Sequence, residues 1–382
     1  MNSRISRREF AARVGAAVGV AIAAPHLVGS VAEARLPKGA PSDSILLNSN
    51  ENPYGPSPRA QEAIKRSRKI AARYPDALET QVVETIARLH SVQPENVILG
   101  CGSGEILRMA DMAFLTAGRK VVAAEPTFEA VLAYARVTRA EPVKVPLTSD
   151  YRHDLPAMAA ACSANAGLVY VCNPNNPTAT LVRRDEMAVF FERVPRGTVI
   201  VLDEAYHHFV ESKEYASGFD WGLKQPNLII VRTFSKVYGM AGMRLGYAVS
   251  TQENIEAMRA HSFWNNSNTS VLEAALASLG DPAHVAEQRR LNSETRGWLV
   301  RELEKEGRKV MPSEANFIMI DVGADVSPII TAFAGRKVLV GRKFPSLPNW
   351  LRVSIGTRKE QEKFLAALRE IVPAKAATAR AA

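Results

Sequence analysis

The sequence predicts an α/β protein built on a mainly parallel sheet flanked by helices. Short apolar runs of strand length alternate with helical segments through the middle of the chain. These runs are apolar on both faces, which is typical of parallel strands covered by helices on either side. Polar residues follow several of the runs, and ligands of such sheets bind outside the carboxyl ends of the strands. At 382 residues, the chain is long enough to bury a large core.

The individual elements are predicted from the same alternation. Strands are expected at 97–100, 120–124, 143–145, 167–172, 198–203, 228–233 and 244–249. Helices are expected between them at 103–115, 128–138 and about 184–193. After about residue 275 the pattern changes to two long charged helices, with short strands between them. The helices are expected at 284–305 and 359–371, and the strands at 315–320 and 351–355. This change predicts a second, smaller α/β domain.

A lysine follows the apolar run Leu228–Val231, where a charged side chain is unexpected. It is Lys236, preceded by Thr233 and Ser235 and followed eight residues later by Arg244. Hydroxyls and a guanidinium suit a phosphate, while a desolvated lysine can act as a nucleophilic amine toward an aldehyde. Pyridoxal phosphate carries both groups. The alternative is a strand-end lysine beside a surface arginine.

Two other strand ends carry groups that suit the same cofactor. Asp203 ends the run 199–203, and a carboxylate there can keep a pyridine nitrogen protonated. Tyr206 and Asn176, the latter in an Asn/Pro turn, can both reach the ring hydroxyl. Taken singly, Asp203 could be a helix N-cap and the Asn/Pro run a solvated turn. Together with Lys236, they indicate pyridoxal phosphate.

These motifs, in this order, resemble the fold-type I pyridoxal-phosphate aminotransferases of class I/II, in particular the histidinol-phosphate aminotransferase group. The matching segments are Asn50–Pro56, Arg73–Asp76, Gly102–Glu105, Pro126–Phe128, Asn175–Thr178, Asp203–Tyr206, Ser235–Lys236, Arg244 and Trp350–Arg352. They cover nearly everything after the N-terminal leader. The resemblance implies the fold-type I large domain with a smaller α/β domain, pyridoxal 5'-phosphate as cofactor and Lys236 as the catalytic residue.

The resemblance also implies the roles of other residues. Those implied to bind the cofactor are Ser103, Gly104, Phe128, Asn176, Asp203, Tyr206, Thr233, Ser235, Lys236, Arg244 and Tyr74. Backbone amides of Ser103 and Gly104, at a helix N-terminus, would bind its phosphate. Arg352 and Tyr54 would bind the substrate, although a strand arginine paired with a surface acid is an alternative for Arg352. Tyr74 would reach the phosphate of a neighbouring subunit, which implies a homodimer with shared sites.

The domain boundaries are predicted from the N-terminal leader and from the change of pattern after about residue 275. They give a signal peptide at 1–34, an N-terminal arm with part of the small domain at 35–74, and a large cofactor-binding domain at 75–274. A small C-terminal domain at 275–373 and a disordered tail at 374–382 complete the chain.

The implied reaction transfers an amino group between an amino acid or related amine and a 2-oxo acid. A related pyridoxal-phosphate decarboxylase or lyase remains open, because the cofactor-binding residues would be shared. The glycine-rich run 97–105, with Glu125 twenty residues later, also resembles the nucleotide fingerprint of a methyltransferase. That interpretation gives no role to Asp203, Lys236 or Arg244. An exported binding protein without catalysis would not need the lysine.

Two departures from the family pattern bear on the substrate. The chain has Ala179 where the family has a glycine after Asn-Pro-Thr. In Val338–Arg342, the family's substrate-phosphate arginine is displaced by one position, to Arg342. A shift by one residue turns a strand side chain to the opposite face. An amino donor other than histidinol phosphate is therefore expected, and aromatic, acidic and secondary-metabolite amines all remain open.

The N-terminus predicts export. Ser6–Phe10 is a twin-arginine pattern, Val14–Ala24 is mildly apolar, and Ala32–Ala34 supplies a small-residue cleavage site. We therefore expect cleavage after Ala34 and a periplasmic protein, exported folded around its cofactor. An amphipathic first helix of the domain is the alternative, and an unprocessed chain would remain cytoplasmic.

Other partner classes are disfavoured. The net charge is +9, but the basic residues are scattered rather than clustered with aromatic side chains, which argues against nucleic acid. No membrane anchor is expected after cleavage, because no apolar run reaches the roughly 20 residues that span a bilayer. No His/Cys cluster has zinc-ligand spacing, so no metal is expected. The three thiols, Cys101, Cys162 and Cys172, cannot all pair. Cys101 and Cys172 each end an apolar strand, where a small residue filling a tight strand end is favoured over a redox or nucleophilic role.

Overall fold

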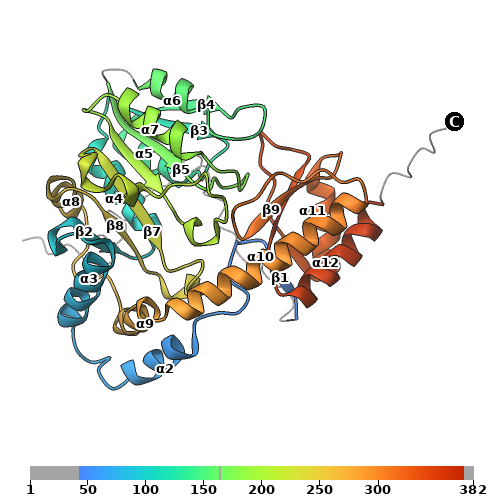
Figure 1. Cartoon of the computed structure of the whole chain (residues 1–382), viewed down its shortest axis with the longest axis horizontal. Coiled ribbons are helices and arrows are strands. Elements are labelled where there is room, and N and C mark those ends of the chain that lie inside the picture. The colour runs from blue at the N-terminus through green and yellow to red at the C-terminus, as the bar shows by residue number, and fades with distance from the viewer. Residues whose placement is uncertain (1–42, 163–164, 374–382) are drawn as a thin grey trace, which may run out of the picture. The chain divides into compact units, whose positions relative to one another are not determined.

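A seven-stranded sheet lies at the centre of the fold in the computed structural model, which describes residues 43–162 and 165–373 (Figure 1). Its strands are β2 (Val97–Gly100), β3 (Lys120–Glu125), β4 (Glu141–Pro146), β5 (Ala166–Cys172), β6 (Val199–Asp203), β7 (Leu228–Thr233) and β8 (Gly246–Val249). Their order is β2-β8-β7-β6-β5-β3-β4. Strand β8 is antiparallel to both neighbours, and the other pairs are parallel. The predicted fold class is confirmed. The predicted leader and tail lie outside the described residues.

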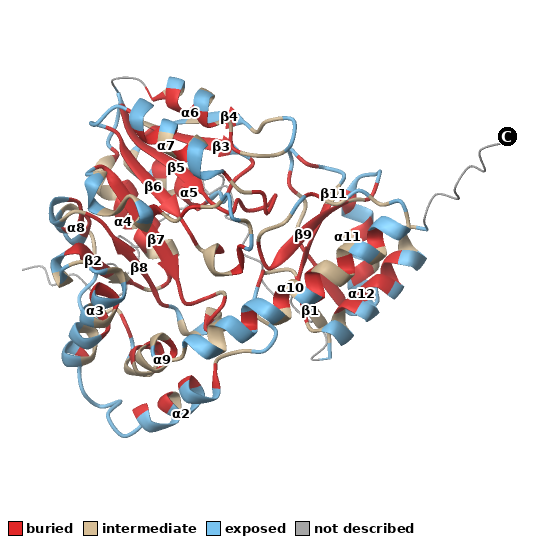
Figure 2. Cartoon of the chain, in the orientation of Figure 1, coloured by how far each residue is buried: buried red, intermediate tan, exposed pale blue. Residues whose placement is uncertain are grey.

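Helices cover both faces of this sheet, and Figure 2 shows the strands as a buried layer between them. One face packs against α4 (Ser103–Phe114), α5 (Ala130–Thr138) and α8 (Gln252–Arg259). The other face packs against α6 (Leu155–Ala161) and α7 (Arg184–Arg193). Because strand side chains alternate between faces, Tyr170 and Cys172 of β5 point to the first core, while Val169 and Val171 point to the second.

A second core forms around two small sheets. Strand β9 (Phe317–Asp321) pairs antiparallel with β11 (Trp350–Ser354), and β1 (Ile45–Leu47) pairs parallel with β10 (Val338–Val340). Helices α10 (Pro282–Lys305), α11 (Val326–Gly335) and α12 (Arg358–Ile371) pack against them. Leu47, near the start of the described chain, is buried with Phe333 and Phe364. The first strand of the described chain is therefore part of a core otherwise made by its last third.

Three further helices pack around the outer end of the central sheet. They are α2 (Pro58–Ser67), α3 (Asp76–His90) and α9 (Thr269–Leu279), and α9 contacts both of the others. Single-turn helices lie at Pro94–Asn96, His207–Phe209, Gly218–Asp220, Gly222–Lys224 and Ala241–Met243. Within the described residues, no helix combines the length and the apolar character needed to cross a bilayer.

One boundary difference from the sequence prediction lies at the start of β8. A strand was expected from residue 244, but it begins at Gly246. Arg244 has a φ of 65°, in the left-handed region, and therefore cannot continue an extended strand. A turn, and not a strand, therefore sets the direction of the Arg244 side chain.

One buried acid in α4 should make the stability of the folded protein depend on pH. Asp111 is 0% exposed, and neither carboxyl oxygen has a hydrogen-bond partner among the described residues. Burial raises the pKa of Asp111 from 3.8 to about 9. Between these values the folded protein holds a proton that the unfolded chain has released, so stability falls as the pH rises, by about 1.4 kcal/mol per pH unit.

Replacing Asp111 with asparagine should abolish this pH dependence. The variant is expected to match wild type near pH 4 and to exceed its free energy of unfolding at pH 8 by several kcal/mol. Urea unfolding at both pH values would measure the difference, with Asp185→Asn, at an exposed position in α7, as the control. An equal effect of Asp111→Asn at both pH values would contradict the explanation.

Candidate active site

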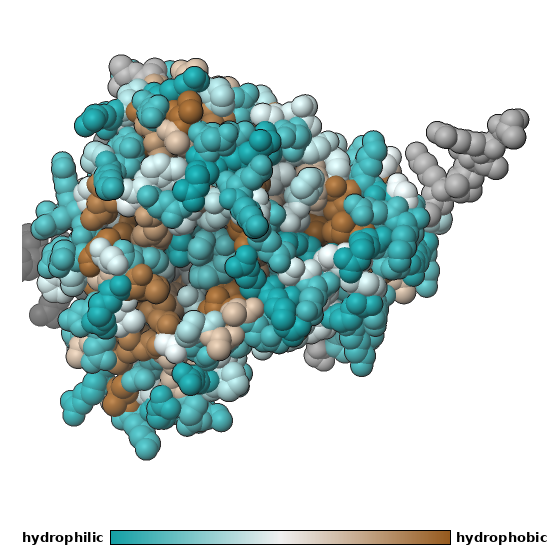
Figure 3. Space-filling view, viewed as in Figure 1, coloured by the Kyte–Doolittle hydropathy of each residue, from teal (hydrophilic) through white to brown (hydrophobic). Residues whose placement is uncertain are grey.

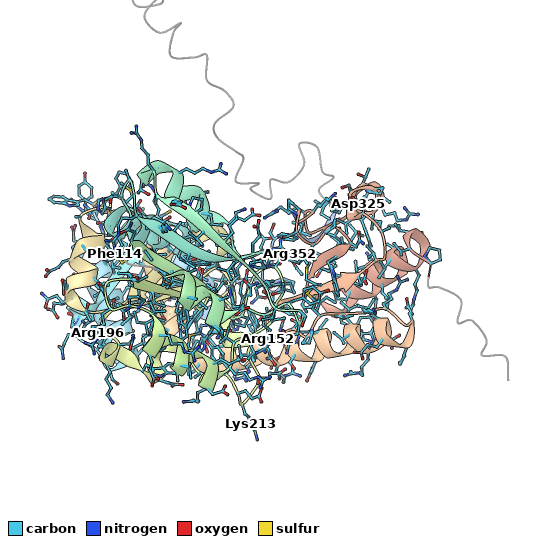
Figure 4. The ribbon with its side chains drawn as sticks, turned by 90° about the horizontal axis from the view of Figure 1, so that it is seen from above. Phe114, Arg152, Arg196, Lys213, Asp325 and Arg352 are labelled. Carbon is cyan, nitrogen blue, oxygen red and sulfur yellow. The ribbon has the colours of Figure 1, made fainter. Side chains whose placement is uncertain are left out.

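The predicted site residues gather at one edge of the central sheet. Strand β6 ends there at Asp203, and strands β5 and β7 end there shortly before Asn176 and Lys236 respectively. Strand β2 ends at the same edge, because it and β7 are both antiparallel to β8. Arg352 comes from β11 in the other core, and Figure 4 labels it near the middle of the molecule, between the central sheet and the C-terminal helices.

An anion cradle lies where β2 leads into α4. Gly102 has a φ of 77° and precedes the helix without a capping side chain, so the first-turn amides of Ser103 and Gly104 remain available. A Cβ on Gly102 would collide with the guanidinium of Arg244. Arg244 Nη1 donates to Ser235 Oγ at 3.4 Å. A cation, a hydroxyl and a helix N-terminus therefore converge on one point, which suits a phosphate.

Thr233 shapes the loop that carries the lysine. Its hydroxyl accepts a hydrogen bond from the Ser235 amide at 3.1 Å and lies 3.5 Å from the carbonyl of Leu245. The side chain is buried. In this structure Thr233 therefore orients the turn that places Ser235 and Lys236.

The Asp203 carboxylate is buried and held on both sides. Its Oδ1 accepts from the Ala205 amide at 3.0 Å, and its Oδ2 accepts from the Tyr170 hydroxyl at 2.8 Å. Burial raises the pKa of Asp203 to about 6, while these two hydrogen bonds oppose the rise. The acid is thus ionised at neutral pH in a low-dielectric setting, where it can stabilise a cationic ring nitrogen.

Lys236 lies beside the N-terminal segment. Its Nζ donates to the carbonyls of Asn50, at 3.1 Å, and Ser49, at 3.3 Å, and lies 5.6 Å from the centre of the Tyr206 ring. Burial, followed by the charge of Arg352, lowers the pKa of Lys236 to about 8. A substantial fraction of neutral amine is therefore present near physiological pH, as a nucleophile or base requires.

A hydrogen-bonded chain connects Arg352 to the ring-hydroxyl position. Arg352 Nη1 donates to Asn176 Oδ1 at 2.7 Å, and Nη2 donates to the Asn48 carbonyl at 2.8 Å. Asn176 Nδ2 donates to the Tyr206 hydroxyl at 3.4 Å, and Asn50 Nδ2 donates to it at 3.1 Å.

Within residues 43–162 and 165–373, Arg352 donates to an amide oxygen and a carbonyl and to no carboxylate, and its Nε lacks a hydrogen-bond partner there. Burial lowers its pKa to about 10. The structure therefore does not show Arg352 in a surface ion pair. A buried guanidinium facing the site without an acid is suited to a substrate anion.

Three predicted residues are exposed, and the structure does not bring Tyr74 together with the other site residues. Phe128 is 38% exposed, Tyr54 is 39% exposed and Tyr74 is 82% exposed. Phe128 follows β3, and Tyr54 lies with Asn52 and Asn316 around a small pocket. Tyr74 lies in the exposed segment between α2 and α3.

The sequence prediction missed several residues that shape this site. Asn316 Nδ2 donates to the Asn50 carbonyl at 2.9 Å, and Ser354 Oγ accepts from the Asn50 amide at 2.8 Å. Asn50 itself has a φ of 54° and lies in a matching motif, but no role was assigned to it. Tyr170 carried a usable signal, because a phenol in a fully buried strand requires a hydrogen-bond partner.

Arg342, the displaced arginine, lies beyond the end of β10. It donates to Glu129 Oε2 at 2.6 Å, and its guanidinium lies 4.3 Å from the centre of the Phe344 ring. Arg352 lies 5.2 Å from the same ring. Phe344 thus has both guanidinium groups beside it, and Glu129 offsets the charge of Arg342.

Ala179 retains the backbone shape that a glycine would favour. Its φ is 63°, and its amide donates to the Asn175 carbonyl at 2.8 Å. The thiols Cys101, Cys162 and Cys172 are all free. The described ranges contain no group of three or more His, Cys, Asp or Glu side chains arranged to hold a metal ion.

The donor set fits pyridoxal phosphate. Gly102, with its helix N-terminus, Ser235 and Arg244 suit the phosphate, and a side chain at position 102 would fill the space that the guanidinium occupies. Asp203 suits the ring nitrogen, Tyr206 and Asn176 suit the ring hydroxyl, and Lys236 suits the aldehyde. The cradle, the buried acid and the buried amine lie at the ends of neighbouring elements.

Comparison with known proteins identifies the family to which this geometry corresponds. Residues 42–368 match the model of aminotransferase class I and II. The histidinol-phosphate aminotransferase of Moorella thermoacetica is 40% identical over 333 residues, covering 86% of each chain. That of Brevibacillus brevis is 36% identical over 332 residues, covering 87% of this chain and 91% of the other.

A solved structure supports the same assignment. Histidinol-phosphate aminotransferase from Sinorhizobium meliloti, in complex with pyridoxal-5'-phosphate, has a TM-score of 0.81 and 27% identity. The match covers 86% of this chain and 90% of that one.

Proposed function

Because this chain belongs to the class I and II aminotransferases, which depend on pyridoxal phosphate, we propose that it transfers an amino group between an amino acid or related amine and a 2-oxo acid. The observation that carries this proposal is the position of Lys236. Its amine has a lowered pKa and lies at the same sheet edge as the Asp203 carboxylate and the anion cradle of Gly102, Ser235 and Arg244.

Each residue has a definite task in this reaction. Bound pyridoxal phosphate supplies an aldehyde carbon that accepts amines and a ring that withdraws electrons from the substrate α-carbon. Lys236 would hold the cofactor at that carbon, and its free amine would act as the base that moves the proton of the substrate α-carbon. Asp203 holds a proton at the ring nitrogen. Arg352 binds the substrate carboxylate and orients the α-carbon toward Lys236.

One experiment can determine both the amino donor and the reaction class. Purified protein loaded with pyridoxal phosphate would be mixed with single donors while its visible absorbance is recorded. The panel includes histidinol phosphate, glutamate, and aromatic and basic amino acids. We expect one donor to bleach the absorbance and a 2-oxo acid to restore it. Absence of visible absorbance in the loaded protein would count against the proposal, and release of carbon dioxide would indicate decarboxylation.

We further propose that the preferred donor is not histidinol phosphate. Arg342 stands one position from the family's substrate-phosphate arginine, and its charge is offset by Glu129 at 2.6 Å. A paired guanidinium attracts a second anion less than a free one, because the carboxylate must first be displaced. If histidinol phosphate has the highest kcat/KM in the panel, this part of the proposal is wrong.

A homodimer is proposed from the exposed aromatic residues. Tyr74 is 82% exposed, and Phe263 and Trp264 are 64% and 94% exposed. Figure 3 shows apolar side chains gathered around α3 and α9 on the lower left of this face. Exposed apolar clusters of this kind are typical of subunit interfaces. Sedimentation at assay concentration should give twice the monomer mass, whereas a fully active monomer would contradict shared sites.

Export is proposed from the leader sequence alone. The twin-arginine pattern at Arg7 and Arg8 precedes an apolar stretch and a cleavage site at Ala34. Cell fractionation of the full-length protein should find it in the periplasm, with Arg35 as its first residue. Recovery of the intact chain in the cytoplasm would overturn this proposal.

A further inference from the structure

Tyr170 is a polar residue in an otherwise apolar strand. Every residue of β5 is buried, and Tyr170 is 0% exposed. Its neighbours Val169 and Val171 point to the opposite core, so the Tyr170 ring packs against the face that α4 covers. A phenylalanine would fill the same space. Burying the phenol oxygen instead costs free energy unless it is hydrogen-bonded, so its partner identifies its use.

That partner is the Asp203 carboxylate on the neighbouring strand. Strands β5 and β6 are parallel, with Cys172 opposite Asp203, so Tyr170 and Asp203 project from the same face. The Tyr170 hydroxyl donates to Asp203 Oδ2 at 2.8 Å, and the Ala205 amide donates to Oδ1 at 3.0 Å. Two donors from two elements fix the plane of the carboxylate.

We propose that Tyr170 is a positioning residue of the active site, whose phenol keeps the Asp203 carboxylate oriented and ionised for the ring nitrogen of pyridoxal phosphate. The inference rests on the proposed function and concerns a residue outside the set predicted from the sequence. A hydrogen bond from a neutral phenol stabilises the charged form of the acid against desolvation. Without it, the proton shared between Asp203 and the ring nitrogen moves toward the carboxyl group.

The direct test is the protonation state of the ring nitrogen before any substrate is added. Wild type and Tyr170→Phe would be loaded with pyridoxal phosphate carrying nitrogen-15 in the ring, and its NMR shift would be measured. The shift of Tyr170→Phe is expected to move toward that of the unprotonated ring. The value of kcat should fall about tenfold with KM within about twofold of wild type, as for loss of one hydrogen bond to a charged group.

A second variant keeps the test decisive if the phenylalanine variant folds poorly. Incorporating a fluorinated tyrosine at position 170 retains the ring and the hydroxyl but makes the phenol a stronger donor. Its nitrogen-15 shift should move in the opposite direction, toward a more fully protonated ring. Tyr247→Phe is the matched control, because Tyr247 is also buried in this sheet and its hydroxyl lies 2.9 Å from His90 Nε2, not beside Asp203.

The outcomes separate this inference from the proposed function. If the protein binds no labelled cofactor, the proposed function fails. If it binds the cofactor and the ring-nitrogen shift is the same in wild type and both Tyr170 variants, Tyr170 only fills space and the inference is overturned. A shift in Tyr247→Phe equal to that in Tyr170→Phe would also overturn it.

Discussion

Replacing Lys236 with alanine is expected to reduce turnover by several orders of magnitude while leaving the fold and cofactor phosphate binding in place. The loss is expected because, in the proposed mechanism, Lys236 would supply both the amine that holds the cofactor and the base that moves the substrate proton. The anion cradle of Gly102, Ser235 and Arg244 does not include Lys236, so the variant should still bind pyridoxal phosphate. Single-turnover kinetics with the best donor would measure the change.

A lysine outside the site provides the control for this variant. Lys213 is exposed, and Figure 4 labels it at the edge of the molecule, far from Arg352 in that view. Lys213→Ala should retain the wild-type rate. Retention of full activity by Lys236→Ala would remove the central residue of the proposed mechanism.

Replacing Arg352 with leucine is expected to lower kcat/KM for carboxylate-bearing donors by about 100-fold or more, mostly through KM. The estimate corresponds to loss of a buried charge-assisted contact of about 2–5 kcal/mol. Arg352→Lys should recover only part of the loss, because an ammonium cannot bond in two places as the planar fork does with Asn176 and the Asn48 carbonyl.

The substrate itself supplies the control for Arg352. A donor analogue with an amide in place of the carboxylate should be a poor substrate of wild type and be affected little by Arg352→Leu. If both compounds lose activity equally, Arg352 acts by supporting Asn176 and not by binding the anion.

The sequence was sufficient to predict the parts of the site that lie at strand ends. Asp203 ends one apolar strand and Lys236 follows another, and parallel strands bring their carboxyl ends together. The contacts of Asn50 could not be predicted in this way. Asn50 meets Lys236 and Asn316 across 186 and 266 residues of chain, so no local pattern connects them.

The antiparallel direction of β8 was also hidden from the sequence. A run of four apolar residues is compatible with either direction, and the connection from β7, residues 234–245, is long enough to allow both. That connection holds Arg244 in a left-handed turn, so the detail that shortened the predicted strand is the one that aims the guanidinium at the cradle.

The pairing of β1 with β10 has a consequence for how the protein is made. Backbone carbonyls of residues 48–50 accept hydrogen bonds from Lys236 and Arg352. This segment is synthesised early, whereas β10 and β11 emerge from the ribosome near the end. Contacts this distant in sequence form late and carry a high loop-closure cost. Lys236 therefore acquires its final surroundings only in a chain that extends through β11. A translation product that stops before β11 contains every strand of the central sheet but lacks Arg352, and so the site is unfinished.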